Sequence, residues 1–264
     1  MIKKHKFIIM FYGNYITNKK KGVVMIISVL NQKGGVGKTT TAVSLASRFA
    51  KMEYRTLLVD LDPQANATVS TGNAPVETVF QKIAISENLT LMPASKNLSF
   101  IEKDLNPDSV KNMLKNEDFD FVLIDCPPVL NNLSLNAVNA ADVLVVPVLS
   151  GDFFSLVGLR DIFLTIQTSA NPNLDYKILI TNINERLAIT PHFIKKLTES
   201  VGKEKLFSTG IRIDSKIKEA PFSGTVIDLY DANSKGSLDY GDLAVEIIEI
   251  KKEGNFFNGN NDLK

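Results

Sequence analysis

The chain has 264 residues, of which 44% are hydrophobic and 22% are charged. This composition is that of a globular protein, and the length suffices for one α/β domain with a single large core. The formal net charge is only +1, so any case for nucleic-acid binding has to rest on local basic patches. One cysteine excludes an internal disulfide and fits a reducing cytoplasm, and no apolar run reaches the ~18 residues of a membrane span.

The first 24 residues differ in character from the rest of the chain. Lysines flank the apolar run from Phe7 to Tyr12, a pattern that mimics a signal peptide, but no small-residue cleavage site follows. Met25 opens the first credible strand, so a misassigned start codon explains the segment equally well. We therefore expect a weakly ordered basic extension over residues 1–24, one domain over 25–252, and a flexible polar tail over 253–264.

The most informative segment follows a strand predicted over residues 25–30 and leads into a helix predicted over 40–50. Strand, glycine loop and helix form the context that a phosphate-binding loop requires, because the curled backbone and the helix N-terminus together attract an anion. Lys38 is predicted to reach the β- and γ-phosphates of a nucleotide, and the Thr39 hydroxyl to ligate Mg²⁺. The predicted nucleotide-binding residues are Lys33, Gly34, Gly35, Val36, Gly37, Lys38, Thr39 and Thr40.

Apolar runs alternate with helical patterns along the rest of the chain. This alternation predicts an α/β fold, with a mostly parallel twisted sheet and helices on both faces. Further strands are predicted over residues 55–60, 89–92, 119–125, 142–148 and 177–181, with an edge strand over 205–208. A polar loop is expected over 63–84. Helices are predicted within 98–115, over 154–168, from Thr190 (N-cap) and Pro191 to about Gly202, and from Ser237 to about Lys252.

Acidic residues end two of the predicted strands. Asp60 and Asp62 follow one strand, and Asp125 closes another after four apolar residues, which is the form of a Walker B motif. An acid at a strand end is often only a helix cap or a solvated group. Carboxyl ends of parallel strands share one edge of the sheet, however, so these acids are expected beside the glycine loop. We predict a Mg²⁺ site formed by Thr39, Asp60, Asp62 and Asp125.

Other residues with reactive side chains have simpler interpretations. Cys126 has no nearby histidine to activate it and is expected to pack in the core. His5 and His192 are too isolated in the sequence to act as metal ligands or catalytic bases.

The loop departs from the pattern G-x-x-x-x-G-K-[ST], since Gln32 stands where glycine is common and a second lysine, Lys33, follows it. In this it resembles the deviant Walker A box of the ParA/MinD class of P-loop ATPases. Residues 59–64 and 124–128 are similar to the next two motifs of that class, as are 136–142 and 146–148. Residues 219–224 and 234–240 resemble the partition branch, in its short form without a helix-turn-helix domain. The resemblance covers roughly residues 25–250 and implies a P-loop NTPase fold.

The resemblance also implies a mechanism. Members of this class form an ATP-bound sandwich dimer, in which the extra lysine of one subunit, here Lys33, reaches the phosphates of the other. By the same resemblance Asp62 positions the attacking water and Asp60 supports the Mg²⁺ shell, so Lys33, Lys38 and Asp62 are the implied catalytic residues. Because phosphoryl transfer depends on positioning and charge, turnover is expected to be slow until a partner completes the site.

Non-specific binding of duplex DNA by the ATP-bound homodimer is the second implied activity, with release when a ParB-like centromere-binding partner stimulates hydrolysis. The protein would then be cytoplasmic and nucleoid-associated. Lysines on a solvated face are ordinary, and Asp214 subtracts charge from a segment where relatives carry Pro-Arg. The candidate DNA-binding residues are Arg186, Lys195, Lys196, Arg212, Lys216 and Lys218.

Two other functions compete with partition. A MinD-like ATPase that acts at the membrane surface would end in a basic amphipathic helix, whereas the glycine- and asparagine-rich tail over residues 253–264 argues against one and predicts no stable membrane association. The basic stretch around residues 7–12 keeps that alternative open. An iron–sulfur carrier of related fold needs a set of cysteine ligands, which one cysteine cannot supply.

Overall fold

Seven strands form one sheet in the order β3-β4-β2-β5-β1-β6-β7. The structure, a computed structural model, describes residues 24–253, and for residues 154–157 the backbone alone. The strands are β1 (Met25–Val29), β2 (Thr56–Asp60), β3 (Ile83–Ala84), β4 (Leu89–Met92), β5 (Phe121–Asp125), β6 (Val143–Leu149) and β7 (Asp175–Thr181). β3 pairs antiparallel with β4 and every other pairing is parallel. The predicted mostly parallel sheet is confirmed.

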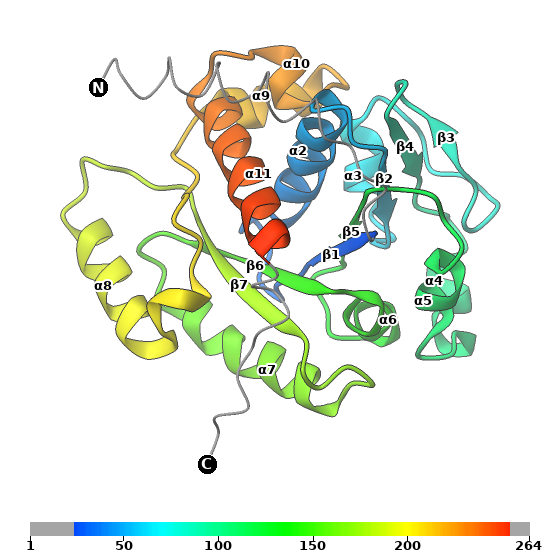
Figure 1. Cartoon of the computed structure of the whole chain (residues 1–264), viewed down its shortest axis with the longest axis horizontal. Helices are drawn as coiled ribbons and strands as arrows, with labels where there is room; N and C mark the ends of the chain where they lie inside the picture. Colours follow the sequence, from blue (N-terminus) through cyan, green and yellow to red (C-terminus); the bar gives the residue numbers. More distant parts are fainter. Residues whose placement is uncertain (1–23, 254–264) are drawn as a thin grey trace.

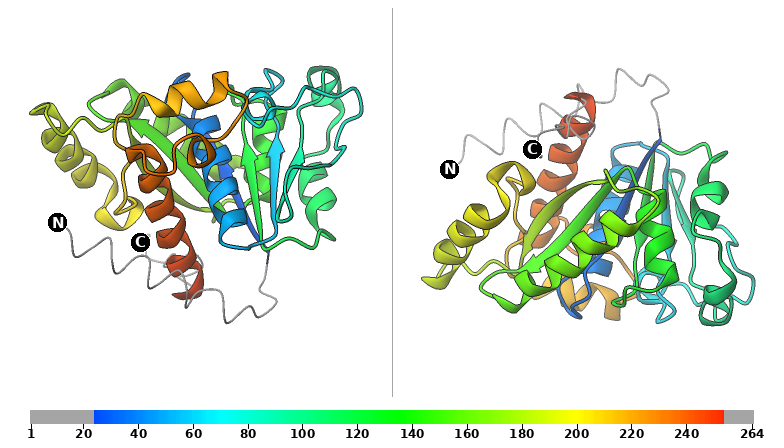
Figure 2. Two further views of the ribbon diagram at one scale, coloured as in Figure 1. Left: turned by 90° about the horizontal axis from the view of Figure 1, so that it is seen from above. Right: turned by 90° about the horizontal axis from the view of Figure 1, so that it is seen from below.

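Helices cover both faces of this sheet (Figures 1 and 2). One face packs against α2 (Lys38–Lys51), α3 (Asn66–Ser70), α9 (Lys216–Phe222), α10 (Ile227–Tyr230) and α11 (Lys235–Glu253). The other packs against α5 (Ser109–Leu114), α6 (Asn132–Ala140), α7 (Phe154–Thr168) and α8 (Ile189–Val201). The chain also forms α4 (Leu98–Ile101), with the 3-10 turns η2 (Glu102–Asp104) and η3 (Lys203–Lys205).

The central strands are apolar on both sides because both of their faces are covered. Ile27 and Leu123 belong to the core beneath α2 and α11, whereas Val122 and Ile124 belong to the core beneath α5 to α8. This is why each central strand reads as a continuous apolar run rather than as an alternating pattern.

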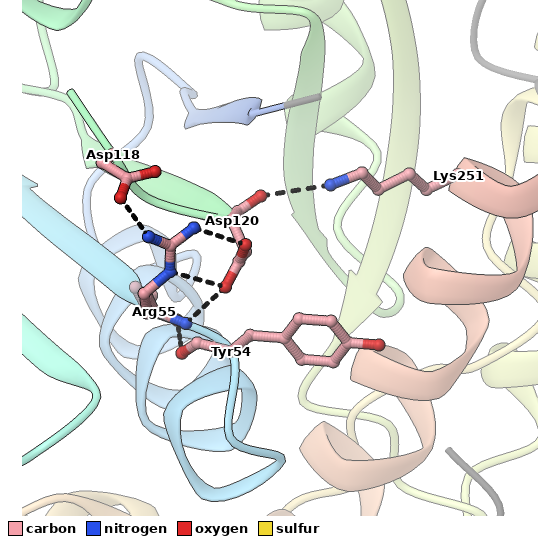
Figure 3. A network of polar contacts seen from close by, with 6 residues as sticks. Tyr54, Arg55, Asp118, Asp120 and Lys251 are labelled. Atoms are coloured by element: carbon pink, nitrogen blue, oxygen red, sulfur yellow. Dashed lines mark hydrogen bonds and ion pairs between the residues drawn. The ribbon is translucent and has the colours of Figure 1, made fainter. Parts of the chain in front are cut away.

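The last helix, α11, contacts the edge of the sheet where the strands begin, as Figure 3 shows. Lys251 of α11 donates to the backbone oxygen of Asp120 over 3.1 Å, and its ammonium lies 4.3 Å from the centre of the Phe121 ring. Arg55 pairs with Asp118 and also contacts the Asp120 carboxylate, with its backbone N–H at 2.8 Å and Nη2 at 3.0 Å. These contacts join β2, β5 and α11 at the end opposite the carboxyl ends of the strands.

Several element boundaries differ from the sequence-based predictions. The helix expected within 98–115 is two helices, α4 and α5, because Pro107 between them has no N–H to continue the backbone ladder. The predicted polar loop over 63–84 contains α3 and the short strand β3. Helices α6, α9 and α10 were not predicted; each is short or rich in asparagine, so its periodicity is weak.

Two local predictions were wrong. The edge strand expected over 205–208 is reduced to one bridge between Leu206 and Ile178, preceded by η3. α8 begins at Ile189, so Thr190 lies inside its first turn and is not the N-cap. The Thr190 hydroxyl donates to the backbone oxygen of Asn184 over 2.9 Å and so stabilises the preceding loop.

The predicted terminal segments over 1–24 and 253–264 lie outside the described residues, apart from Val24 and Glu253 at their borders. Within residues 24–253, no helix is long and apolar enough to cross a membrane.

Candidate functional site

The glycine loop lies between β1 and α2, as predicted. Gly35 and Gly37 have backbone φ angles of 75° and 95°, which residues with a Cβ rarely adopt. Gly37 is the N-cap of α2 and supplies no side-chain cap, so the first N–H groups of the helix remain available to an anion. A Cβ added at Gly34 or Gly35 would meet no atom within 4 Å, so there is open space beside the loop for phosphates.

Strand pairing brings the predicted acids to this loop. In the parallel register Asp125 at the end of β5 lies opposite Val29 of β1 on one side and Asp60 of β2 on the other. Both carboxylates are buried, Asp125 fully and Asp60 with 2% of its surface exposed. The two motifs separated by 65 positions therefore meet at the carboxyl edge of the sheet, where α/β folds bind their ligands.

Asp125 is a buried carboxylate without a full complement of contacts. Neither of its oxygens has a hydrogen bond of good geometry among the described residues. Burial, followed by the neighbouring Asp60 charge, raises the pKa of Asp125 well above its ordinary value, and the Thr39 hydroxyl opposes this only in part. A buried acceptor with no donor is costly unless a ligand occupies the site, and the chemistry of the Asp125 carboxylate suits a cation.

Asp60, unlike Asp125, accepts several hydrogen bonds. Its Oδ2 accepts from the backbone N–H and the hydroxyl of Thr68, at 2.8 and 2.7 Å, and its Oδ1 accepts from the Asp62 N–H at 3.1 Å. Burial nevertheless raises the pKa of Asp60 to about 6, because desolvation outweighs these hydrogen bonds. Asp60 is therefore held in a fixed orientation beside Asp125.

The residues present fit Mg²⁺. Within residues 24–253 no group of three or more His, Cys, Asp or Glu side chains forms a closed metal cage. Mg²⁺ does not need one, since it is usually held by one or two carboxylates together with substrate phosphates and water. Asp125, Asp60 and the Thr39 hydroxyl, three of the four predicted Mg²⁺ ligands, offer hard oxygen donors at the foot of the glycine loop.

Lys38 lies at the start of α2 with only 8% of its surface exposed. Its Nζ donates to the backbone oxygen of Lys33 over 3.3 Å. Burial lowers the pKa of Lys38, whereas the charges of Asp125, Cys126 and Asp62 act in the opposite direction. A buried ammonium facing carboxylates on one side and an open loop on the other is suited to a triphosphate, which would supply the missing negative charge.

Asp62 lies in the turn that connects β2 to α3. Its Oδ1 accepts from the Gln64 N–H over 3.0 Å, and only 5% of the residue is exposed. Ala65, which ends this turn, has φ of 58°, a strained conformation for a residue with a Cβ. The turn thus holds Asp62 in one place near Asp60 and Lys38.

The second loop lysine, Lys33, is anchored from both its backbone and its side chain. Its N–H donates to Asn31 Oδ1 over 3.0 Å, and Asn31 Nδ2 in turn donates to the Pro147 oxygen of β6 over 2.7 Å. The Lys33 ammonium forms an ion pair with Asp152, in the turn after β6.

The candidate DNA-binding residues occupy different elements. Arg186 is exposed in the loop before α8, and Lys195 and Lys196 are exposed on α8. Arg212 makes a two-pronged ion pair with Asp239, with contacts of 2.6 to 3.0 Å, and Lys216 pairs with Glu219. Lys218 is exposed on α9. The loop that carries Arg186 pairs with the Arg212 segment through the bridge between Ile183 and Arg212, whereas Figure 1 shows α8 and α9 at separate sides of the molecule.

Sequence reasoning missed three residues that hold the site together. Asn31 ties the glycine loop to β6, and Thr68 fixes Asp60. The Thr181 hydroxyl, at the end of β7, donates to the Val36 oxygen of the loop over 2.9 Å. Only Asn31 had a usable signal, since it lies two residues before Lys33; the other two are brought in by tertiary structure.

Comparison with known proteins agrees with this geometry. A family model described as an AAA domain matches residues 24–178. The chromosome partitioning protein ParA of Caulobacter vibrioides is 34% identical over 257 residues, which covers 86% of this chain and 95% of that protein. The sporulation initiation inhibitor protein Soj of Bacillus subtilis is 35% identical over 248 residues, covering 84% and 97%. The chain belongs to the ParA family of partition ATPases.

Membership in this ATPase family assigns nucleotide hydrolysis to the chain. Solved structures support the fold. Cobyrinic acid a,c-diamide synthase from Mycobacterium smegmatis, solved with ADP and magnesium, matches with a TM-score of 0.72 and 27% identity over 88% of this chain and 97% of that one. The septum site-determining protein MinD from Pyrococcus horikoshii, complexed with Mg-ADP, matches with a TM-score of 0.71, at 20% identity and over 87% and 98%. The P-loop NTPase fold is confirmed, and it is a fold that binds nucleotide with Mg²⁺.

Proposed function

We propose that this ParA-family protein is a Mg²⁺-dependent, slow ATPase that dimerises on ATP, binds duplex DNA without sequence preference and leaves it after hydrolysis. A ParB-like protein would stimulate that hydrolysis, and the cargo would be a plasmid or a chromosome. The observation that carries the proposal is the Lys33-containing glycine loop above the buried carboxylates of Asp60 and Asp125. The identity to ParA and Soj over most of the chain supports the same assignment.

Each residue of the site has a role in this proposal. The first N–H groups of α2 and the Lys38 ammonium would bind the phosphates. Thr39, Asp60 and Asp125 would hold the Mg²⁺ ion and its water. Bound Mg²⁺ would offset the charge that develops on the transferred phosphoryl group. Asp62, fixed by its turn, would orient the attacking water, and Lys33 of the opposite subunit would stabilise the same charge from the other side.

The position of Lys33 supports the proposal of slow turnover by the isolated protein. In the described chain its ammonium is engaged with Asp152 of its own subunit, so the site of a single chain lacks one positive charge. Completion of the site would then require a second chain and, for full rate, a stimulating partner.

The DNA switch is tested by retention of duplex DNA of unrelated sequences. We expect ATP with Mg²⁺ to cause binding, ADP to cause none, and the affinity to fall steeply as salt rises, because phosphate contacts release counterions. Asp62→Ala, which should bind ATP without hydrolysing it, should stay on the DNA. Equal retention with ADP, or none with ATP, would contradict the proposal.

The same samples test the membrane alternative. Sedimentation with vesicles that contain anionic lipid should leave the protein in the supernatant with either nucleotide. ATP-dependent sedimentation with vesicles, in the absence of DNA binding, would instead assign the protein to a surface-positioning function.

A further inference from the structure

The ion pair between Lys33 and Asp152 joins the glycine loop to the turn that follows β6. Lys33 has 40% of its side chain exposed and Asp152 has 17%. The pair therefore lies at the border of the site, on the side where the loop is open to solvent. No motif singled out Asp152, and the proposed reaction does not use it.

The turn that carries Asp152 has a defined shape. The Asp152 N–H donates to the Leu149 oxygen over 3.2 Å, and the Ser150 N–H donates to the Thr181 oxygen of β7 over 2.9 Å. Gly151 between them has φ of 80°, a backbone conformation that residues with a Cβ rarely adopt. The Asp152 carboxylate thus extends from backbone that is tied to both β6 and β7.

Lys33 is drawn toward the same side by its other contacts. Asn31 links the Lys33 N–H to Pro147 of β6, so backbone and ammonium are both held to the β6 side of the site. The Lys33 carbonyl accepts from Lys38 Nζ over 3.3 Å. The backbone and the ammonium of Lys33 are therefore both engaged by residues of the same chain.

We propose that Asp152 is an intrasubunit latch, which holds Lys33 in its own subunit until ATP-driven association of two chains draws the lysine across. The inference rests on the proposed function, in which Lys33 acts on the phosphates of the partner. An ammonium cannot stay paired with Asp152 and also reach the opposite nucleotide, so the latch opens before the site is complete. Each dimer requires two such ion pairs to break, one in each subunit, and the free energy of breaking them opposes dimerisation.

The test compares Asp152→Asn, which removes the charge and keeps the shape, with wild-type protein. Dimerisation with the analogue AMPPNP and Mg²⁺ is measured by sedimentation velocity over a range of protein concentrations. Half-exposed ion pairs are individually weak, so loss of two of them should lower the concentration needed for half-dimerisation by about three- to tenfold. An unchanged or higher concentration would overturn the latch, because Asp152 would then be neutral or would position Lys33 for its task.

Asp175→Asn is the matched control. Asp175 pairs with Lys205 over 2.7 Å at comparable exposure, but at the opposite end of the strands, and its loss should leave dimerisation unchanged. A second control adds Asp152→Asn to Lys33→Ala. If Asp152 acts through Lys33, it should have no further effect there, whereas a general structural effect would persist.

A readout that needs no dimer separates this inference from the proposed function. In nucleotide-free protein labelled with ¹⁵N-lysine, NMR relaxation should report a restricted Lys33 ammonium, which becomes mobile in Asp152→Asn. Equal motion in both proteins would overturn the latch. Failure of wild-type protein to dimerise with AMPPNP would overturn the proposed function instead, and the relaxation data would still decide whether Asp152 holds Lys33.

Discussion

Asp125 is the residue at which stability and function are most directly opposed. Its carboxylate is fully buried with no hydrogen bond of good geometry, and burial raises its pKa. Asp125→Asn removes that charge and faces Asp60 with an amide that can donate. We expect the nucleotide-free variant to be more stable by about 1–3 kcal/mol, because burying a carboxylate without a hydrogen-bond donor costs at least as much as a lost hydrogen bond.

Thermal unfolding without nucleotide measures this gain, and ATPase assays should find no hydrolysis by the same variant. Wild-type protein should in turn be stabilised more by Mg-ATP than the variant is. A variant that is less stable than wild type would mean that Asp125 has a favourable partner in the empty site.

Lys38 is expected to determine nucleotide affinity. The Lys38 ammonium is already buried in the folded protein, so it needs no further desolvation when it binds phosphate. Lys38→Ala removes this cation. We expect binding of ATP to weaken by about 100-fold, since hydrogen bonds to charged groups are among the strongest. Titration with a fluorescent ATP analogue measures this, and affinity within threefold of wild type would contradict the assigned role.

Among single residues, those in the motifs could be predicted from the sequence. The residues that hydrogen-bond to them and hold them in place could not. Lys33, Lys38 and Asp125 are recognisable because glycine spacing and strand ends limit where phosphate and Mg²⁺ ligands can lie. Thr68 and Thr181 hold Asp60 and the Val36 carbonyl by contacts with residues 8 and 145 positions away. Nothing in the local sequence distinguishes them from other threonines.

At the scale of elements, the short helix α3 connects the site to its surroundings. The Thr68 hydroxyl donates to Asp60 over 2.7 Å and accepts from the Ala94 N–H, at the end of the β4 segment, over 2.9 Å. Thr68→Val keeps the shape but removes the acceptor of the Ala94 N–H and leaves Asp60 Oδ2 with the Thr68 N–H alone. We expect a loss of about 1–3 kcal/mol in unfolding free energy and a lower rate of hydrolysis at saturating ATP.

Ser70→Ala is the control for this prediction. Ser70 lies in the same helix and its hydroxyl donates only to the Asn66 oxygen within that helix, over 2.7 Å. Denaturant unfolding and ATPase rates should change little. If both variants behaved alike, the effect would belong to the helix as a whole and not to its contact with Asp60.

The predicted elements were reliable where their patterns were long and apolar. The five central parallel strands β1, β2, β4, β5 and β6 and the helices α2, α7 and α11 were found within a few residues, since burial on both faces leaves continuous apolar runs. The α6 helix was missed because four of its nine residues are polar asparagine or serine. The segment over 205–208 lies beside the β7 edge but forms only one bridge there, a distinction that depends on pairing rather than on composition.

At the scale of the whole molecule, the sequence predicted the layers but not the strand order. Alternation of strands and helices implies a parallel sheet covered on both faces. The insertion of β5 between β1 and β2 brings Asp125 to Asp60 and Val29, and this pairing joins residues far apart in the chain. The sequence analysis expected these acids at one edge of the sheet, but the pairing of β5 with β1 and β2 is known only from the structure.

The role of Lys33 across two subunits can be tested by mixing variants. Lys33→Ala and Asp62→Ala are each expected to be inactive alone. In a mixed dimer, the Lys33→Ala subunit keeps its own Asp62 and receives Lys33 from its partner, so one of the two sites is complete. An equimolar mixture should recover about a quarter of the wild-type rate, because half of the dimers are mixed and each has one working site.

The control is a mixture of Lys33→Ala with Lys38→Ala/Lys33→Ala, in which no subunit can donate the lysine and no activity should return. If Lys33 acted within its own subunit, the first mixture would also stay inactive, because neither chain would hold both residues. The ion pair with Asp152 makes this comparison informative, since it keeps Lys33 within its own chain in the protein described above. Recovery of activity would therefore require that contact to open when two chains associate.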